Sequence, residues 1–187
     1  MLKRSFDILI SFVSLLLILP IAVIICLLIK ISSKGPILFW SKRIGQNNKV
    51  FCMPKFRTMA SETPIIATHL IKEPERYLTG IGSLLRKFSL DEIPQLLSIF
   101  KGDMSIVGPR PALFNQYDLI KLRSSENIHI IKPGLTGLAQ VNGRDNLSIE
   151  KKVALDKEYL INQSFFLDLK IIFKTIYLVF LGRDIRH

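Results

Sequence analysis

Two adjacent carboxylates, Asp91 and Glu92, are the residues of this chain best suited to do chemistry. Arginines stand on either side of them in the sequence, at Arg86 and Arg110. A carboxylate can act as a nucleophile or hold a divalent cation, and the forked guanidinium group of arginine recognises phosphate. The combination predicts chemistry on a phosphate ester.

The same carboxylates also have a purely structural interpretation. Ser89 and Glu92 have the spacing of a capping box, in which Ser89 is the N-cap of a helix. Pro94 argues against that register, because it falls where the helix already needs a backbone amide, and the helix would then start near Asp91. Either start places both carboxylates at a helix N-terminus, where the helix dipole favours their ionised form.

Further segments carry residues that suit a phosphate site. In the GPRP sequence of residues 108–111, prolines on both sides of Arg110 restrict the backbone and so fix its direction; the alternative is a rigid loop with a solvated arginine. Lys55 and Arg57 share one face if their segment is extended; the alternative is a charged strand edge. Glycines within residues 132–144 would let the backbone approach a ligand closely.

Composition narrows the class of protein. The chain has 187 residues, 49% of them hydrophobic, which excludes a disordered chain and suits one ordinary domain. A formal net charge of +11 indicates an anionic partner, such as nucleic acid, a membrane surface or a phosphorylated substrate, although a generally basic surface would explain it as well. The two cysteines and three histidines have no disulfide or zinc-ligand spacing.

An apolar segment near the N-terminus predicts a membrane location. Residues 8–29 contain no charged side chain, and a helix of that length is enough to cross a hydrocarbon core about 30 Å thick. Lysines and arginines flank it on both sides, so a spanning helix would leave one basic flank on the disfavoured side. Pro20, near the middle, kinks or breaks a helix. These features favour a re-entrant helix-break-helix; a spanning helix is the alternative.

The rest of the chain predicts short strands and helices. Apolar runs at 37–40 and 50–53 flank a polar link that contains a glycine, which indicates two strands, and Pro54 closes the second. A helix that carries lysines on an apolar background at residues 165–181 suits a membrane interface, and a core helix is the alternative. The other helices are expected at residues 78–88, 93–100 and 149–161.

These elements predict an α+β, mainly helical protein with a re-entrant membrane helix-break-helix at its N-terminus. Residues 1–34 form that membrane segment. Residues 35–187 form one cytoplasmic domain with short strands and interfacial amphipathic helices.

Five sequence blocks stand in the order typical of one protein family. They are KFRTM (55–59), SLDEIPQL (89–96), KGDMSIVGPRP (101–111), KPGLTGLAQVNGR (132–144) and LDLK (167–170). With these blocks the chain resembles the bacterial sugar transferase family, the monotopic phosphoglycosyl transferases, over nearly its whole length and including the N-terminal apolar segment.

The resemblance implies a reaction and roles for particular residues. Members transfer a sugar phosphate from a UDP-sugar to undecaprenyl phosphate, which gives undecaprenyl diphosphate-sugar and UMP. By resemblance, Asp91 is the nucleophile of a covalent phosphosugar intermediate, and Glu92 is associated with Mg²⁺. The residues implied to contact substrate or to support the site are Lys55, Arg86, Arg110, Pro111, Arg144 and Asp168.

The resemblance also implies partners and a location. The expected partners are a UDP-sugar, undecaprenyl phosphate and membrane lipids, but no nucleic acid, and a homodimer through the soluble face is a further expectation. The expected location is the bacterial inner (cytoplasmic) membrane, with the catalytic domain of residues 35–187 on the cytoplasmic face. An N-acetylated amino sugar is the expected donor sugar, while a hexose, a deoxyamino sugar and the glycan pathway stay open.

Two alternative functions stay open. A membrane-anchored basic module that binds anionic lipid or nucleic acid would not need Asp91 or Glu92, and its affinity would fall steeply with salt. Direct transfer in a ternary complex would use one of the two carboxylates as a general base only.

Overall fold

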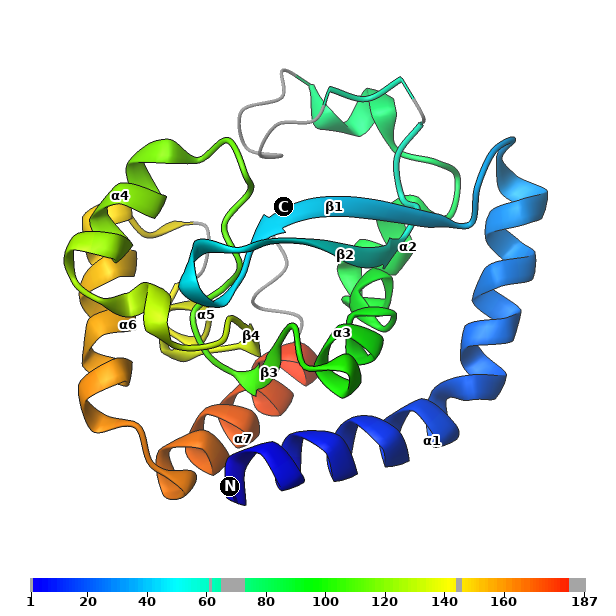
Figure 1. Cartoon of the computed structure of the whole chain (residues 1–187). Helices are drawn as coiled ribbons and strands as arrows, with labels where there is room; N and C mark the ends of the chain where they lie inside the picture. Colours follow the sequence, from blue (N-terminus) through cyan, green and yellow to red (C-terminus); the bar gives the residue numbers. More distant parts are fainter. Residues whose placement is uncertain (1, 61, 65–72, 144–145, 182–187) are drawn as a thin grey trace.

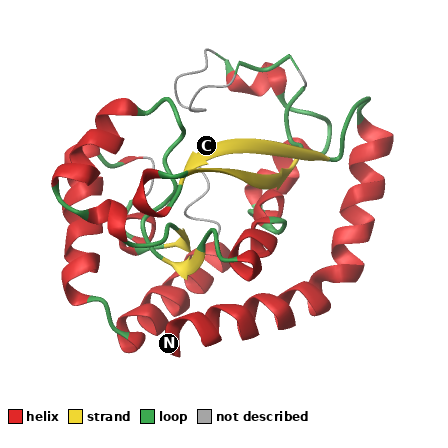
Figure 2. Cartoon of the chain, viewed as in Figure 1, coloured by secondary structure: helices red, strands yellow, loops and turns green. Residues whose placement is uncertain are grey.

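The computed structural model describes residues 2–60, 62–64, 73–143 and 146–181 (Figure 1). Helices predominate over two small sheets, which confirms a mainly helical protein with short strands (Figure 2). The helices are α1 (Leu2–Ser32), α2 (Gly82–Lys87), α3 (Gln95–Lys101), α4 (Tyr117–Ser125), α5 (Leu138–Val141), α6 (Ile149–Asn162) and α7 (Phe165–Leu181). The strands are β1 (Leu38–Ile44), β2 (Val50–Phe56), β3 (Ser105–Val107) and β4 (Gly134–Thr136). Short 3₁₀ turns are η1 (Gln46–Asn48), η3 (Pro74–Tyr77), η4 (Leu90–Glu92) and η5 (Ile128–Ile130).

The apolar N-terminal segment is one helix, α1, of 31 residues with Pro20 inside it. Figure 1 shows α1 running along the bottom of the molecule from the N-terminus and then bending to climb the right side. A proline inside a helix removes one backbone hydrogen bond and produces such a bend. By length and composition α1 can cross a membrane, and apolar side chains such as Leu17 and Leu27 are exposed along it. The expected break between two helices is therefore a bend within one helix.

The predicted hairpin is formed by β1 and β2, which pair antiparallel and are longer than expected. Asn47 and Asn48 adopt positive φ in the connection, as asparagine does more readily than most residues. Pro54 does not close the second strand. It pairs opposite Trp40, and β2 continues to Phe56, because a proline without an N–H is tolerated in a strand whose partner lies on only one side.

The second sheet pairs β3 with β4 in parallel, and its glycines are required by backbone packing. A Cβ on Gly134 would lie 2.1 Å from the amide nitrogen of Gly108, and a Cβ on Gly137 would lie 2.1 Å from the carbonyl oxygen of Gly108. These contacts give a packing reason for Gly134 and Gly137, and the expectation that the backbone of residues 132–144 approaches a ligand stays a prediction. The described glycines at 134 and 137 let one backbone segment approach another.

The chain that follows α1, here called the globular part, packs around a core below the hairpin. Met53 of β2, Ile99 of α3 and Ile171 of α7 are buried in one cluster, which α1 joins through Leu15 and Ile18. The second half of α1 packs elsewhere, with Ile25 and Ile29 in a separate cluster beside β2 and α2. α1 thus contacts the globular part on both sides of its bend.

The C-terminal helix α7 is half-buried, as an amphipathic helix is. It buries Asp168 and Ile171 but exposes Phe166, Phe173 and Tyr177. Its start lies beside the start of α1, where the rings of Phe6 and Phe165 meet edge to face at a centroid distance of 5.2 Å. The exposed aromatic face suits a membrane interface, and that location stays a prediction.

Candidate active site

The acidic pair lies in the 3₁₀ turn η4 rather than in the first turn of an α-helix. Ser89 has a left-handed backbone (φ 53°), and its side chain makes no capping hydrogen bond, so the capping-box interpretation is wrong. The turn is closed by backbone bonds instead, such as that from the Glu92 N–H to the Ser89 carbonyl. α3 then begins at Gln95, with Pro94 just before it, where its missing N–H is not needed.

Glu92 is held by two cations that come from different parts of the chain. Lys55 of β2 donates to Glu92 Oε1 at 2.9 Å, and Arg110 of the GPRP loop donates to the same oxygen at 3.0 Å. Glu92 is only 8% exposed, so these charge-assisted bonds form in a region of low dielectric constant, where they are stronger than at the surface. Lys55, Glu92 and Arg110, three of the candidate site residues, are therefore in contact.

Asp91 is more deeply buried than Glu92 and has fewer hydrogen-bond partners. It is 4% exposed, its Oδ2 lies 3.6 Å from Lys55 Nζ, and its Oδ1 has no hydrogen-bond partner among the described residues. Burial raises the pKa of Asp91, and the neighbouring charge of Glu92 adds to the rise, whereas Lys55 and two arginines oppose it. An unpaired buried carboxylate oxygen is costly, and such groups cluster at functional sites.

Arg86 approaches the pair from the side of α2. Its Nε donates to Thr58 Oγ1 at 3.1 Å, and its Nη2 lies 3.0 Å from the sulfur of Met59. Burial lowers the pKa of Arg86, while the charge of Asp91 opposes this decrease. Arg86 is thus a partly buried cation within electrostatic reach of Asp91, and the KFRTM block contributes Thr58 and Met59 to hold it.

The loop that carries Arg110 is held by a series of hydrogen bonds to its carbonyl groups. The Pro109 carbonyl accepts from the Gly134 N–H, and the Arg110 carbonyl accepts from Arg123 at 2.7 Å. The Pro111 carbonyl accepts from Arg43 at 3.0 Å. A loop fixed in this way aims the Arg110 side chain without further ordering when a ligand binds. Because the Arg110 side chain also donates to Glu92, it is a positioned arginine rather than a freely solvated one.

The remaining predicted residues lie in other surroundings. Pro111 is buried, and its carbonyl accepts the hydrogen bond from Arg43 that helps to fix the loop around Arg110. Asp168 lies in a different polar cluster, with Lys3 and Tyr159, and no described contact joins it to the acidic pair. Arg144 lies outside the described residues. Their roles in binding substrate stay predictions.

Arg57 does not share the site with Lys55, although the two were expected on one face. It is 4% exposed and donates to the carbonyls of Ser33 and Lys34 and to the Ser33 hydroxyl, at distances of 2.6–2.9 Å. Arg57 therefore fixes the chain just after the C-terminal end of α1.

The carboxylates suit a magnesium ion that is shared with a substrate. Mg²⁺ prefers hard oxygen ligands and is bound through one or two carboxylates together with substrate phosphates and water, rather than by a complete protein cage. Asp91 and Glu92 offer two such groups, and Asp91 Oδ1 has a vacant lone-pair position among the described contacts. The described residues contain no group of three or more acidic, histidine or cysteine side chains that would hold a metal alone.

Several supporting residues were not anticipated from the sequence. Arg123 holds the Arg110 carbonyl and is itself paired with the buried Asp156 at 2.6 Å. Lys3, Asp7 and Ser11 lie one turn apart along α1, and the last two are buried. The spacing of four residues was a signal for a polar stripe on α1, whereas nothing local marks the pairing of residues 123 and 156.

Comparisons with known proteins show the family of this chain. A model of the family described as bacterial sugar transferase matches residues 1–182. The chain is 40% identical to the exopolysaccharide production protein ExoY of Rhizobium meliloti, over 98% of this chain and 87% of that protein. It is 42% identical to the uncharacterized sugar transferase EpsL of Bacillus subtilis, over 100% and 91%. It is 39% identical to the UDP-glucose:undecaprenyl-phosphate glucose-1-phosphate transferase of Escherichia coli, over 98% of this chain and 41% of that protein.

The family match defines a transferase, and the long apolar helix α1 suits association with a membrane. The chain belongs to the bacterial sugar transferase family and is a phosphoglycosyl transferase.

Proposed function

We propose that this protein transfers a sugar-1-phosphate from a UDP-sugar to undecaprenyl phosphate, with UMP as the second product. The observation that carries the proposal is the contact of Lys55 and Arg110 with Glu92 beside the buried Asp91. It places a carboxylate that can attack phosphorus next to cations that can bind the charged diphosphate of a UDP-sugar. The names of relatives support the reaction: the Escherichia coli protein acts on UDP-glucose and undecaprenyl phosphate. Relatives named as exopolysaccharide production proteins support a role in surface glycan synthesis.

The proposed reaction has two displacements at one phosphorus. In the first, a carboxylate oxygen of Asp91 bonds to the β-phosphorus of the UDP-sugar, and the bond from that phosphorus to the oxygen of UMP breaks. In the second, a phosphate oxygen of undecaprenyl phosphate attacks the same phosphorus and releases the Asp91 carboxylate. Splitting one transfer into two is what a covalent nucleophile achieves.

The cations of the site serve both displacements. Arg110, which contacts Glu92, and Arg86, which lies within electrostatic reach of Asp91, neutralise diphosphate charge that would repel Asp91. Glu92 holds Lys55 and Arg110 in place and, with Asp91, would hold Mg²⁺. When bound, the ion supplies further charge neutralisation on the phosphate oxygens.

The two ends of α1 support a re-entrant membrane topology. Lys3 is bonded to Asp168 and Val107 near the N-terminal end, and Arg57 holds the residues that follow the C-terminal end. Both ends are therefore tied to the same globular part, whereas a spanning helix would separate them by a hydrocarbon core about 30 Å thick. We place the globular part on the cytoplasmic face of the bacterial inner membrane, where basic flanks are favoured, in contact with membrane lipids.

The donor sugar stays a prediction. We expect an N-acetylated amino sugar, and relatives are named for both kinds of donor: glucose in Escherichia coli and N-acetylgalactosamine in Aeromonas hydrophila. A panel of UDP-sugars assayed for UMP release decides between them. A homodimer through the soluble face is likewise a prediction, which mass measurement in detergent would test.

One experiment tests the covalent route. Purified protein is incubated with Mg²⁺ and each UDP-sugar in the absence of lipid acceptor, and UMP and intact protein mass are measured. A phosphosugar adduct that is absent from Asp91→Asn supports the proposal. Full turnover with lipid in Asp91→Asn would support direct transfer, and undiminished lipid binding without any transfer would support the basic binding module.

A further inference from the structure

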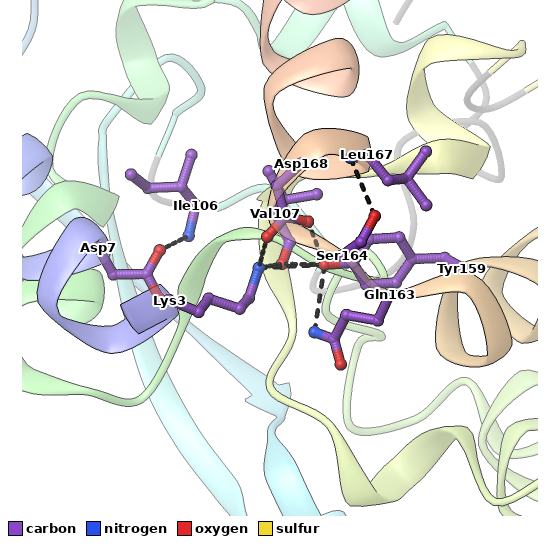
Figure 3. Close-up of polar contacts among 9 residues, drawn as sticks. All are labelled: Lys3, Asp7, Ile106, Val107, Tyr159, Gln163, Ser164, Leu167 and Asp168. Atoms are coloured by element: carbon purple, nitrogen blue, oxygen red, sulfur yellow. Dashed lines mark hydrogen bonds and ion pairs between the residues drawn. The ribbon is translucent and has the colours of Figure 1, made fainter. Parts of the chain in front are cut away.

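A second, partly buried polar cluster, gathered around Lys3, joins α1 to β3, α6 and α7 (Figure 3). The ammonium group of Lys3 donates to Asp168 Oδ2 at 2.5 Å, to the Val107 carbonyl at 3.0 Å and to the Tyr159 hydroxyl at 3.1 Å. A lysine ammonium has three donors, so all of them are used. Figure 3 shows the three acceptors converging on this one nitrogen.

Tyr159 links the other members of this cluster. It is 1% exposed, and its hydroxyl donates to Asp168 Oδ1 at 2.7 Å while lying 3.2 Å from the Val107 carbonyl. Burial raises the pKa of Tyr159, and the hydrogen bond to Asp168 raises it further, so the phenol keeps the proton that it donates. The hydroxyl therefore connects Lys3, Asp168 and the end of β3.

A second contact from α1 lies one helical turn further on. Asp7 is 3% exposed, and its Oδ1 accepts a hydrogen bond from the Ile106 N–H at 3.0 Å (Figure 3). Together Asp7 and Lys3 satisfy the Ile106 N–H and the Val107 carbonyl on β3. The other side of β3 is occupied by β4, so α1 completes the hydrogen bonding of this strand as a neighbouring strand would.

This strand leads directly to the loop that carries Arg110. Val107 is the last residue of β3, and Arg110 follows three residues later. Beyond Val107 the loop is held by Gly134, Arg123 and Arg43. The cluster at Lys3 and Tyr159 therefore fixes the end of the loop that adjoins β3. Gly134, Arg123 and Arg43 fix the rest of the loop.

We propose that Tyr159, together with Lys3, is a positioning residue for Arg110, so that the first turns of the membrane helix form part of the scaffold of the active site. The inference rests on the proposed function, because it assumes that Arg110 binds the diphosphate. It adds that removing a hydroxyl group that has no described contact with the acidic pair lowers the rate through Arg110.

A double-mutant cycle on phosphosugar transfer tests this positioning role. Tyr159→Phe removes only the hydroxyl and is expected to lower kcat/KM about tenfold, the usual size of effect for one lost buried hydrogen bond. In an Arg110→Gln background the same substitution is expected to have little further effect, because it acts through Arg110. The control is Tyr117→Phe on α4, an exposed tyrosine, which is expected to change nothing. Equal losses in both backgrounds, or full activity of Tyr159→Phe, overturn the proposal.

Hydrogen exchange gives a readout that does not depend on transfer. Tyr159→Phe is expected to speed exchange in peptides that cover residues 106–112 but not in the β1–β2 hairpin. Unchanged exchange in residues 106–112 overturns the proposal even if the protein transfers no sugar.

A second pair of variants covers the case in which Tyr159→Phe does not fold. Asp7→Asn keeps an oxygen that accepts from the Ile106 N–H and is expected to be active. Asp7→Leu removes that oxygen and is expected to lower transfer, with little further effect in the Arg110→Gln background. Equal activity of the two Asp7 variants contradicts the proposal.

Discussion

At the scale of single residues, the burial of Asp91 sets function against stability. Its pKa is raised above the ordinary value of 3.8 because the folded protein disfavours the charged form. Stability is therefore lost as the pH rises through the folded pKa, since the folded state binds the proton more tightly than the unfolded state. In the proposed mechanism, this poorly solvated carboxylate is the nucleophile toward phosphorus, and the fold tolerates the cost of its burial.

The first prediction concerns Asp91→Asn, which removes the charge but keeps the shape. We expect the variant to lose the phosphosugar adduct and, at pH 7, to gain about 1 kcal/mol in the free energy of unfolding, because a neutral amide costs less to bury than a carboxylate whose charged form is desolvated. For a chain of this size that gain is a Tm increase of about 2–4 °C. Thermal unfolding in detergent measures it, and a clearly lower Tm would contradict the burial argument.

The second prediction concerns Lys55, whose charge is the largest of those that lower the pKa of Asp91. Lys55→Met removes that charge, so the pKa of Asp91 rises further. Because the nucleophile must be ionised, the acid limb of the pH profile for adduct formation is expected to shift to higher pH. Lys49→Met, at an exposed lysine of the same hairpin, is the matched control. An acid limb that stays in place in Lys55→Met would show that Lys55 does not act on Asp91.

At the scale of elements, the third prediction compares two glycines. A Cβ on Gly134 would lie 2.1 Å from the amide nitrogen of Gly108, the first residue of the loop that carries Arg110. Gly134→Ala must therefore push β4 away from this loop. We expect a loss of about 3 kcal/mol in stability together with a loss of transfer. Gly80→Ala is the control, because nothing lies within 4 Å of the position of its Cβ. Unfolding curves and UMP release measure both variants, and similar behaviour of the two would refute the packing argument.

The elements also show how far local sequence patterns predict structure. The hairpin and the major helices follow from apolar runs and their periodicity, which are local signals. The predicted capping box is wrong because Ser89 takes a left-handed backbone conformation. The predicted strand end at Pro54 is wrong because β2 pairs with only one strand, so a residue without an N–H is tolerated in it. Both errors arise from tertiary surroundings that spacing along the sequence does not report.

At the scale of the whole molecule, the site is assembled from distant parts of the chain. Lys55, Glu92 and Arg110 were each predicted, from a family resemblance and from residue type, and the structure brings them into contact. The pairing of Lys3 with Asp168 spans 165 residues and was not predicted. Contacts at such separation depend on how the elements pack, and the side-chain types alone do not determine them.

The last prediction tests how the membrane helix relates to the globular part. A helix of 31 residues is about 46 Å long when straight, yet both of its ends contact one globular part. In a chain with Cys26 and Cys52 replaced by serine, single cysteines at Ser5 and Lys34, both exposed, report the location of each end. We expect a membrane-impermeant maleimide to label both positions in inverted vesicles and neither in intact spheroplasts. Labelling of Ser5→Cys in spheroplasts alone would establish a spanning helix, and the contacts of Lys3 with Val107 and Asp168 could then not form in the membrane.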